Sequence, residues 1–465
     1  MKHGCSAWSE DEFLSLDLGD PRLVRRLKAI AAGAADHPHG RINALFKNGA
    51  AKEAAYRFVE NPRVDPESLI AASADAAMRR APNDDVFVVV DQTSLSFPDP
   101  NQIRGLGRVG SDAFRKTARG IEVMSGLVLD DSGAVLGLAS QEWLLRKEEV
   151  APANGHDKRT ILEKESVLWI RAMSTSMTNI RRTRPGARVT FLADRGCDVY
   201  GAFNAANCLG ADFIIRSAQN RRLVDGSTLR DALRAAKPLG YITRRLRFKG
   251  HAGVEERLVR VAVRVVDVEL DLHTNRTGAN RGRSRLRVVR ITEDTKNPSV
   301  SWTLLTTWKL DGLDDAIDVV DAYCHRWRVE DFHRAWKRGD CDVESAQLRS
   351  VRSIKCWATI LAIVATRVER LKLLSRQEPD RLARDELNED EIEALRLISG
   401  ERRHWPQDWS LMTMGQAANL IAYLGGWGGR SQGLPGSTIL GRGLERVEAA
   451  ALVVKAMRER PSRSD

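Results

Sequence analysis

Four side chains that could hold a phosphate group or a metal ion recur at fixed spacing in residues 321–338, DAYCHRWRVEDFHRAWKR. This stretch contains no Gly or Pro, and Val329, Phe332 and Trp336 recur at the spacing of one buried helix face. The opposite side of the same helix presents a phenol, a guanidinium, a carboxylate and an ammonium, which belong to Tyr323, Arg326, Glu330 and Lys337. Three of these groups suit phosphate contact, and the carboxylate suits a divalent metal. The alternative is a solvated helix face whose charges form ion pairs.

Two further carboxylates are expected to lie at one edge of a sheet. Residues 86–90 and 189–193 are short apolar runs typical of strands buried on both faces, and each is followed by an aspartate, Asp91 or Asp194. Open α/β sheets carry their chemistry at the carboxyl ends of such strands. A single aspartate there is often only a turn former or a helix cap. Two of them, together with Glu330, make a three-carboxylate group.

Three carboxylates at one place repel each other unless cations lie between them. Oxygen ligands without His or Cys select Mg²⁺ or Mn²⁺. Two such ions, about 3.5–4 Å apart, can activate a water or a 3′-hydroxyl and stabilise the leaving oxygen of a phosphodiester. Acid/base carboxylate pairs of the glycosidase kind are the rival chemistry, but they need no basic surround.

The composition favours a polyanionic partner. The chain has 465 residues, 43% of them hydrophobic, a net charge of +11 and a pI of about 9.5, with basic residues along its whole length. Nucleic acid is the leading candidate, although a surplus of solubilising Lys and Arg would give the same numbers. The six cysteines show no paired spacing, and no apolar run approaches a signal core or a membrane span. We therefore expect a cytoplasmic protein with no membrane partner.

The chain divides into three expected regions. Residues 1–70 predict small helices, with Asp20 as a candidate N-cap, and these suit either DNA backbone contact or a helical lid. Residues 71–374 predict the α/β core, interrupted at about 218–310 by alternating basic and apolar residues that indicate a β-rich insertion. Residues 375–465 predict helices that serve either intramolecular packing or an oligomer interface.

The signature and its neighbours resemble a known family. The spacing Y-x2-R-x3-E-x6-K, which begins at Tyr323, resembles the signature of bacterial DDE transposases of the insertion-sequence IS-four group. The segments LGDPR, AAYRFVENP, DQTSLSF, QEWL, ADRGCDVY, FIIRS and LGGWGGR extend the resemblance over nearly the whole chain. After Asp194 the sequence RGCDVY departs from a more acidic run in the relatives, so no helper carboxylate is expected there.

The resemblance implies a ribonuclease-H-like catalytic core in which Asp91, Asp194 and Glu330 bind two Mg²⁺ ions, with Mn²⁺ as a substitute. It implies a bacterial enzyme that acts as a homodimer on double-stranded DNA, binding transposon end repeats and joining them to target DNA. The implied reaction is cut-and-paste transposition through a hydrolytic nick, a hairpin and strand transfer, with residues 1–70 binding the ends and residues 375–465 forming the dimer. The implied DNA-binding residues are Tyr323, Arg326, Lys337, Trp302, Arg216, Arg22, Arg26 and Arg57.

Two other functions stay open on the sequence alone. One is a catalytically silent DNA-binding regulator derived from a transposase, which would have no need of three mutually repelling carboxylates. The other is a related nuclease that acts on another nucleic acid.

Overall fold

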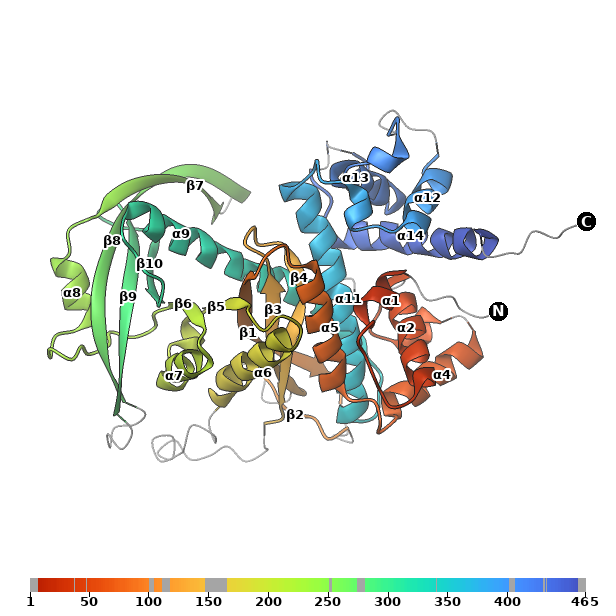
Figure 1. The fold of residues 1–465 in the computed structure, drawn as a ribbon, viewed down its shortest axis with the longest axis horizontal. Helices are drawn as coiled ribbons and strands as arrows, with labels where there is room; N and C mark the ends of the chain where they lie inside the picture. Colours follow the sequence, from red (N-terminus) through yellow and green to blue (C-terminus); the bar gives the residue numbers. More distant parts are fainter. Residues whose placement is uncertain are drawn as a thin grey trace, which may run out of the picture.

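The structure is a computed structural model that describes residues 7–36, 38–46, 48–99, 104–110, 118–146, 165–250, 253–273, 281–339, 341–400, 406–429, 431 and 433–458. Within them, no helix is long and apolar enough to cross a membrane. The prediction of an α/β protein is confirmed, because helices surround one large mixed sheet (Figure 1).

Five strands form the central part of this sheet. They are β1 (Asp85–Phe97), β3 (Arg119–Leu129), β4 (Val135–Leu144), β5 (Arg188–Ala193) and β6 (Asp212–Arg216). Their order is β4-β3-β1-β5-β6, with β1, β5 and β6 parallel and β3 antiparallel to both of its neighbours. The turn at 130–133 that joins β3 to β4 has the expected position, with the Gly133 N–H donating to the Asp130 carbonyl. This arrangement is consistent with a ribonuclease-H-like core.

Strand β1 is longer than the apolar run predicted. We expected it to end at Asp91, but it continues to Phe97 because β3 pairs with it as far as Phe97 and Arg119. Its parallel neighbour β5 stops earlier, at the pair of Val90 with Ala193. Beyond Val90, β1 therefore has β3 on one side, and no strand of the described residues pairs with its other edge.

The β-rich segment after β6 continues the same sheet. The strands β7 (Gly240–Gly250), β8 (Gly253–His273), β9 (Arg281–Glu293) and β10 (Ser301–Thr306) add in the order β6-β10-β9-β8-β7, and the short helix α8 (Leu229–Ala235) packs on β8. The short β2 (Gly107–Arg108) pairs with β3 at the other end, which gives ten strands in the described part of the chain. The sheet therefore runs unbroken from the core into the insertion (Figure 1).

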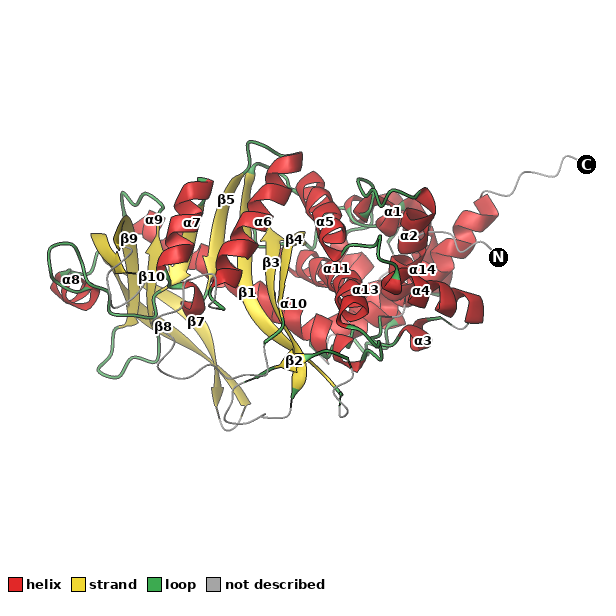
Figure 2. Cartoon of the chain, turned by 90° about the horizontal axis from the view of Figure 1, so that it is seen from below, coloured by secondary structure: helices red, strands yellow, loops and turns green. Residues whose placement is uncertain are grey.

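Helices cover the two faces of the sheet separately (Figure 2). One face packs apolar side chains such as Val88 and Val90 against α6 (Val167–Thr183) and α7 (Tyr200–Leu209), with part of α5 (Pro66–Arg80). The other face packs Val89 and Leu95 against α9 (Leu313–Cys324), α10 (Arg328–Lys337) and α11 (Val351–Gln377). Because alternate residues of a strand point to opposite faces, the odd-numbered Asp91 lies on the side of α10.

The first helices are α1 (Ala7–Glu12), α2 (Pro21–Asp36), α3 (Ile42–Leu45) and α4 (Gly49–Glu60). Of these, α2 and α4 pack on α11, which is buried along nearly its whole length, while α1 packs on α2 and α3 packs on α4. Helix α5 runs through residue 70 without a break and packs on β4.

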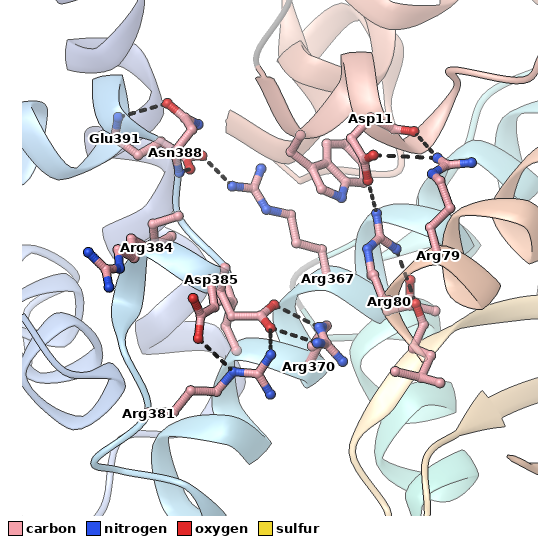
Figure 3. A pocket seen from close by; sticks show the side chains of 16 residues that line it. Asp11, Arg79, Arg80, Arg367, Arg370, Arg381, Arg384, Asp385, Asn388 and Glu391 are labelled. Carbon is pink, nitrogen blue, oxygen red and sulfur yellow. Dashed lines mark hydrogen bonds and ion pairs between the residues drawn. The ribbon is translucent and has the colours of Figure 1, made fainter. Parts of the chain in front are cut away.

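The C-terminal helices α12 (Glu389–Ile398), α13 (Met414–Leu424) and α14 (Ser437–Arg458) share an apolar cluster with the end of α11. A cavity of about 510 Å³ lies where this region meets α1, α5 and α11. Figure 3 shows that arginines and carboxylates alternate around it, with Arg370 and Arg381 both directed at one carboxylate. That carboxylate is Glu386, at 2.6 Å from Arg370 and 3.2 Å from Arg381.

Candidate active site

The helix predicted over residues 321–338 is divided in two by a turn. Helix α9 ends at Cys324, the 3-10 turn His325–Trp327 follows, and α10 begins at Arg328. A 3-10 turn winds more tightly than an α-helix, so side chains before and after it do not keep one α-helical stripe. Tyr323 and Arg326 are consequently 2% and 7% exposed rather than on an open face. The predicted apolar side, which α10 contributes, is buried as expected.

The three predicted carboxylates come from three separate elements and share one electrostatic environment. Asp91 lies on β1, Asp194 follows β5 directly, and Glu330 lies in the first turn of α10. Burial, the charge of Asp194 and the charge of Glu330 together raise the pKa of Asp91 to about 7. The nearby Arg326 and the N–H of Gln92 oppose this rise.

Two of these carboxylates accept hydrogen bonds from other groups of the protein. Glu330 Oε1 accepts from Arg326 Nη2 at 2.7 Å, and Asp194 Oδ1 accepts from the N–H of Gly196 at 2.7 Å, which caps a 3-10 turn. Among the described residues, no three His, Cys, Asp or Glu side chains are arranged closely enough to hold a metal ion. The donor set nevertheless fits a hard divalent cation, because it consists of oxygens and because the repulsion felt by Asp91 is the kind that such a cation relieves.

Cationic and aromatic side chains surround this group on one side. The guanidinium of Arg326 lies 5.9 Å from the ring of Tyr323, and that ring meets the ring of Trp302 edge-on at 5.4 Å. The guanidinium of Arg216 lies over the Trp302 ring, 5.8 Å from its centroid. Burial lowers the pKa of Arg216, and the charges of Arg195 and Arg326 lower it further. Cations that repel each other in this way are suited to an anionic partner.

Lys337, the last residue of α10, reaches β1 two residues beyond Asp91. Its Nζ donates to Thr93 Oγ1 at 3.2 Å and lies 3.8 Å from Glu344 Oε1. Glu344 also accepts from the Ser96 N–H at 2.8 Å, at the edge of β1 that no other strand covers, and from Arg338 Nε at 2.8 Å. One carboxylate thus joins the end of α10 to the strand that carries Asp91.

Two residues of this site were not predicted from the sequence. Glu344 is one; its contact with Ser96 joins positions 248 residues apart, which no local pattern indicates. The other is His333, whose Nδ1 lies 3.7 Å from Asp91 Oδ2. Burial and the charge of Lys337 lower the pKa of His333 to about 3, so its imidazole is neutral. Its position three residues after Glu330 places it on the same side of α10, and this is the signal that could have found it.

The predicted basic residues of the N-terminal helices lie elsewhere. Arg22, Arg26 and Arg57 are exposed on α2 and α4, which lie across α11 from β1 (Figure 1). Arg22 pairs with Asp20 at 3.2 Å, and Arg57 pairs with Glu53 at 2.7 Å. The structure therefore gathers one set of predicted site residues around β1 and leaves three apart. The gathered set is Asp91, Asp194, Glu330, Tyr323, Arg326, Lys337, Trp302 and Arg216.

Comparison with known proteins adds two family matches and a structural likeness. Residues 5–64 match the family described as transposase DNA-binding, and residues 82–367 match the family described as transposase DDE domain. Among solved structures, the chain matches the cryo-EM structure of a piggyBac transposase synaptic complex with hairpin DNA, with a TM-score of 0.36 and 8% sequence identity, over 93% of this chain and 72% of that one.

Proposed function

The chain belongs to the transposase DDE domain family, and from that membership we propose that it binds the terminal inverted repeats of a transposon and moves the element by Mg²⁺-dependent cut-and-paste transposition. The observation that carries this proposal is the convergence of three carboxylates from separate elements, since Asp194 and Glu330 lie near enough to the buried Asp91 for their charges to act on it. A protein that only binds DNA gains nothing from such repulsion.

The side chains around the carboxylates would hold the DNA strand at the position of the cut. Arg326 and Arg216 would bind the phosphates beside it, and Tyr323 would donate from its phenol. Lys337, tethered at Thr93, would hold a phosphate on the side of β1. Trp302, partly buried and edge-on to Tyr323, offers a ring for a base that leaves the stack.

The proposed reaction begins with a hydrolytic nick that frees a 3′-hydroxyl, and it continues through a hairpin to strand transfer into target DNA. When held by Asp91, Asp194 and Glu330, two Mg²⁺ ions, or Mn²⁺ in their place, would supply charge stabilisation and an acidified water. Arg326 orients Glu330 by donating from Nη2 to Oε1 at 2.7 Å. The neutral imidazole of His333 covers Asp91 on its buried side.

Other regions would bind the ends and the second subunit. The match of residues 5–64 to a DNA-binding family supports end recognition by the N-terminal helices, through the exposed Arg22, Arg26 and Arg57. Homodimer formation through residues 375–465 is supported by large apolar side chains exposed there, at Leu397, Leu411, Leu434, Val453 and Met457. The reaction would take place in the bacterial cytoplasm, on nucleoid DNA.

The test is Mg²⁺-dependent nicking of DNA that carries the cognate terminal repeats. We expect Glu330→Gln to bind the ends as the wild type does but to lose nicking, by at least 10³-fold in rate. The matched control is Asp331→Asn, which removes the adjacent carboxylate of the same helix turn and should still nick. Equal cutting by the wild type and Glu330→Gln would exclude this active site. If the wild type and both variants bind the ends but none of them nicks, the protein is a regulator.

A further inference from the structure

Three arginines of the β-rich segment gather on the face of the sheet opposite to Trp302. Arg264 on β8 and Arg290 on β9 are directly opposite each other in the strand register. Trp302 packs with the cluster that contains Val289 and Ile291, whereas Arg290, between these two in sequence, points to the other face. Helix α8 lies on that face and contributes Arg230, whose charge lowers the pKa of Arg290.

This pair differs from the others on the same two strands. Further along, β8 and β9 place an acid opposite three arginines, at Asp267 with Arg287, Glu269 with Arg285 and Asp271 with Arg283. Like charges directly opposite each other destabilise a sheet, whereas opposite charges stabilise it. Among the described residues, no carboxylate lies within 4.0 Å of the charged nitrogens of Arg230, Arg264 or Arg290. The repulsion at this one position is therefore left uncompensated by the protein.

Hydroxyl groups complete the surroundings of Arg290. Its Nε donates to Thr292 Oγ1 at 3.1 Å, and its terminal nitrogens lie 3.5 Å from Thr303 Oγ1 and 3.4 Å from Ser301 Oγ. Arg264 is held by donation of its Nε to the carbonyl of Ala236, at the end of α8, at 3.2 Å. Burial lowers the pKa of Arg290, and the charges of Arg264 and Arg230 lower it further. Both guanidinium groups are thus fixed in place and directed at one half-buried position.

We propose that Arg264 and Arg290, with Arg230, bind a phosphate group of a DNA backbone that runs over this face of the sheet. Guanidinium groups match the oxygens of a phosphate in geometry and charge, and the hydroxyls of Ser301 and Thr303 can donate to the same oxygens. The site lies on the opposite face from the carboxylates, so its DNA segment is distinct from the one at the cut. This assignment of DNA as the source rests on the proposed function.

Two measurements on the full chain test the site without any cleavage. The first is thermal unfolding of DNA-free protein at low salt, with and without inorganic phosphate. We expect phosphate to stabilise the wild type but not Arg264→Gln/Arg290→Gln, and we expect the DNA-free double variant to be at least as stable as the wild type, because a repulsion has been removed. Arg264→Gln alone is the second variant, since Gln can keep the donation to Ala236.

The second measurement is the affinity for a duplex of arbitrary sequence at several salt concentrations. Each lost phosphate contact lowers the slope of log affinity against log salt by about 0.9, so the double variant should show a reduction of roughly that size. The matched control is Arg287→Gln on the other face of β9, where an acid already pairs with the arginine, and it should keep both the stabilisation by phosphate and the salt slope of the wild type.

The outcomes separate the site from its ligand and from the active site. If the double variant loses the stabilisation by phosphate and also shows the lower salt slope, the result supports a DNA phosphate at this position. Loss of phosphate stabilisation with an unchanged salt slope would support an anion site but overturn DNA as its source. Lower stability of the DNA-free single variant, or no change in either measurement, would overturn the site itself. Glu330→Gln should keep the wild-type slope whether or not the chain proves to cut DNA, so failure of the proposed reaction is distinguishable from failure of this site.

Discussion

Asp91 is held in a state that costs folding free energy. An ordinary aspartate has a pKa of 3.8, whereas burial and the charges of Asp194 and Glu330 raise the pKa of Asp91 to about 7. The folded protein therefore binds a proton at this position that the unfolded chain has already lost. Such a group contributes stability below the unfolded pKa and loses that contribution as the pH rises through the folded pKa.

We expect the metal-free protein to lose stability between about pH 4 and pH 7 through Asp91, by up to the order of 4 kcal/mol. Asp91→Asn should remove this part of the pH dependence, so the variant should be more stable than the wild type at pH 8 and similar to it near pH 4. Urea unfolding at a series of pH values, with a chelator present, measures the difference.

The matched control for this prediction is Asp212→Asn, which removes an exposed carboxylate from β6 in the same sheet. It should leave the pH dependence unchanged. Addition of Mg²⁺ at pH 8 should stabilise the wild type but not Asp91→Asn. A wild type and Asp91→Asn with parallel pH profiles would show that Asp91 does not carry the repulsion.

Glu344 is expected to position Lys337 rather than to act on DNA itself. Its carboxylate joins Lys337, Arg338 and the Ser96 N–H. Glu344→Gln keeps an oxygen for Ser96 but loses the charge that orients the ammonium. We expect the nicking rate to fall about tenfold, which corresponds to the loss of an ion pair worth about 1.4 kcal/mol, with end binding and unfolding midpoint nearly unchanged.

A double-mutant cycle separates positioning from general damage. In a Lys337→Met background, Glu344→Gln should reduce nicking no further, because its effect passes through Lys337. Arg338→Gln, which removes the mostly exposed second partner of Glu344, is the control and should nick normally. Independent, multiplying effects of the two substitutions would show that Glu344 has only a structural role.

At the scale of elements, apolar runs predicted buried strands correctly. They did not predict a strand that is extended only because a neighbouring strand pairs with it. Residues 189–193 and the turn at 130–133 were predicted correctly, because burial on both faces and turn chemistry are local signals. Residues 91–97 were not predicted as a strand, since DQTSLSF is polar and only the partner strand β3 keeps it extended. The division of 321–338 by a 3-10 turn was also missed, because nothing in its propensity interrupts an α-helix.

The candidate site shows the same division. The residue types and spacing around Glu330 were visible in the sequence, and so was the chemistry they suit. The partners of Lys337 and Glu344 on β1 were not, because Thr93 and Ser96 are more than 240 residues away from them and belong to a strand end that no local pattern marked. What the sequence could not supply was the register that places β1 against α10.

Gly40 is where the N-terminal helices meet the segment after α10. A Cβ at this position would lie 2.0 Å from the carbonyl oxygen of Asp342, and the Gly40 carbonyl accepts from Trp357 Nε1 at 2.7 Å. Asp342 has φ of 40°, in the left-handed region. The contact is therefore between two backbones, and neither can yield by rotating a side chain.

We expect Gly40→Ala to destabilise the protein by about 1–3 kcal/mol, because the two segments must separate to admit the methyl group. The effect should be measurable as a lower urea midpoint and as slower nicking, since Glu344 lies two residues after Asp342. Gly186→Ala, at a turn with open space around it, is the control and should change neither. Normal stability of Gly40→Ala would show that this junction is looser than the contact distance indicates.

At the scale of the whole molecule, α11 connects the three regions. Its buried side chains contact the N-terminal helices, β4 of the core and the C-terminal helices α13 and α14. Ion pairs reinforce the last of these contacts around the cavity in Figure 3. Arg367 on α11 pairs with Glu391 of α12 at 2.5 Å and with Glu448 of α14, and both carboxylates are almost wholly buried. Because burial raises the pKa of Glu391, its charge depends on this guanidinium.

We expect Arg367→Met to destabilise the C-terminal region by about 3–5 kcal/mol, since it leaves two buried carboxylates without their cation. Urea unfolding should then show α12–α14 detaching before the core, as a separate early transition. Arg367→Met/Glu391→Leu/Glu448→Leu should restore a single transition, because apolar side chains of similar size replace the whole group. Arg384→Gln, at an exposed arginine of the same cavity, is the control. If the early transition persists in the triple variant, α11 holds the C-terminal helices through the ion pairs themselves. If Arg367→Met shows a single transition, the apolar cluster alone holds them.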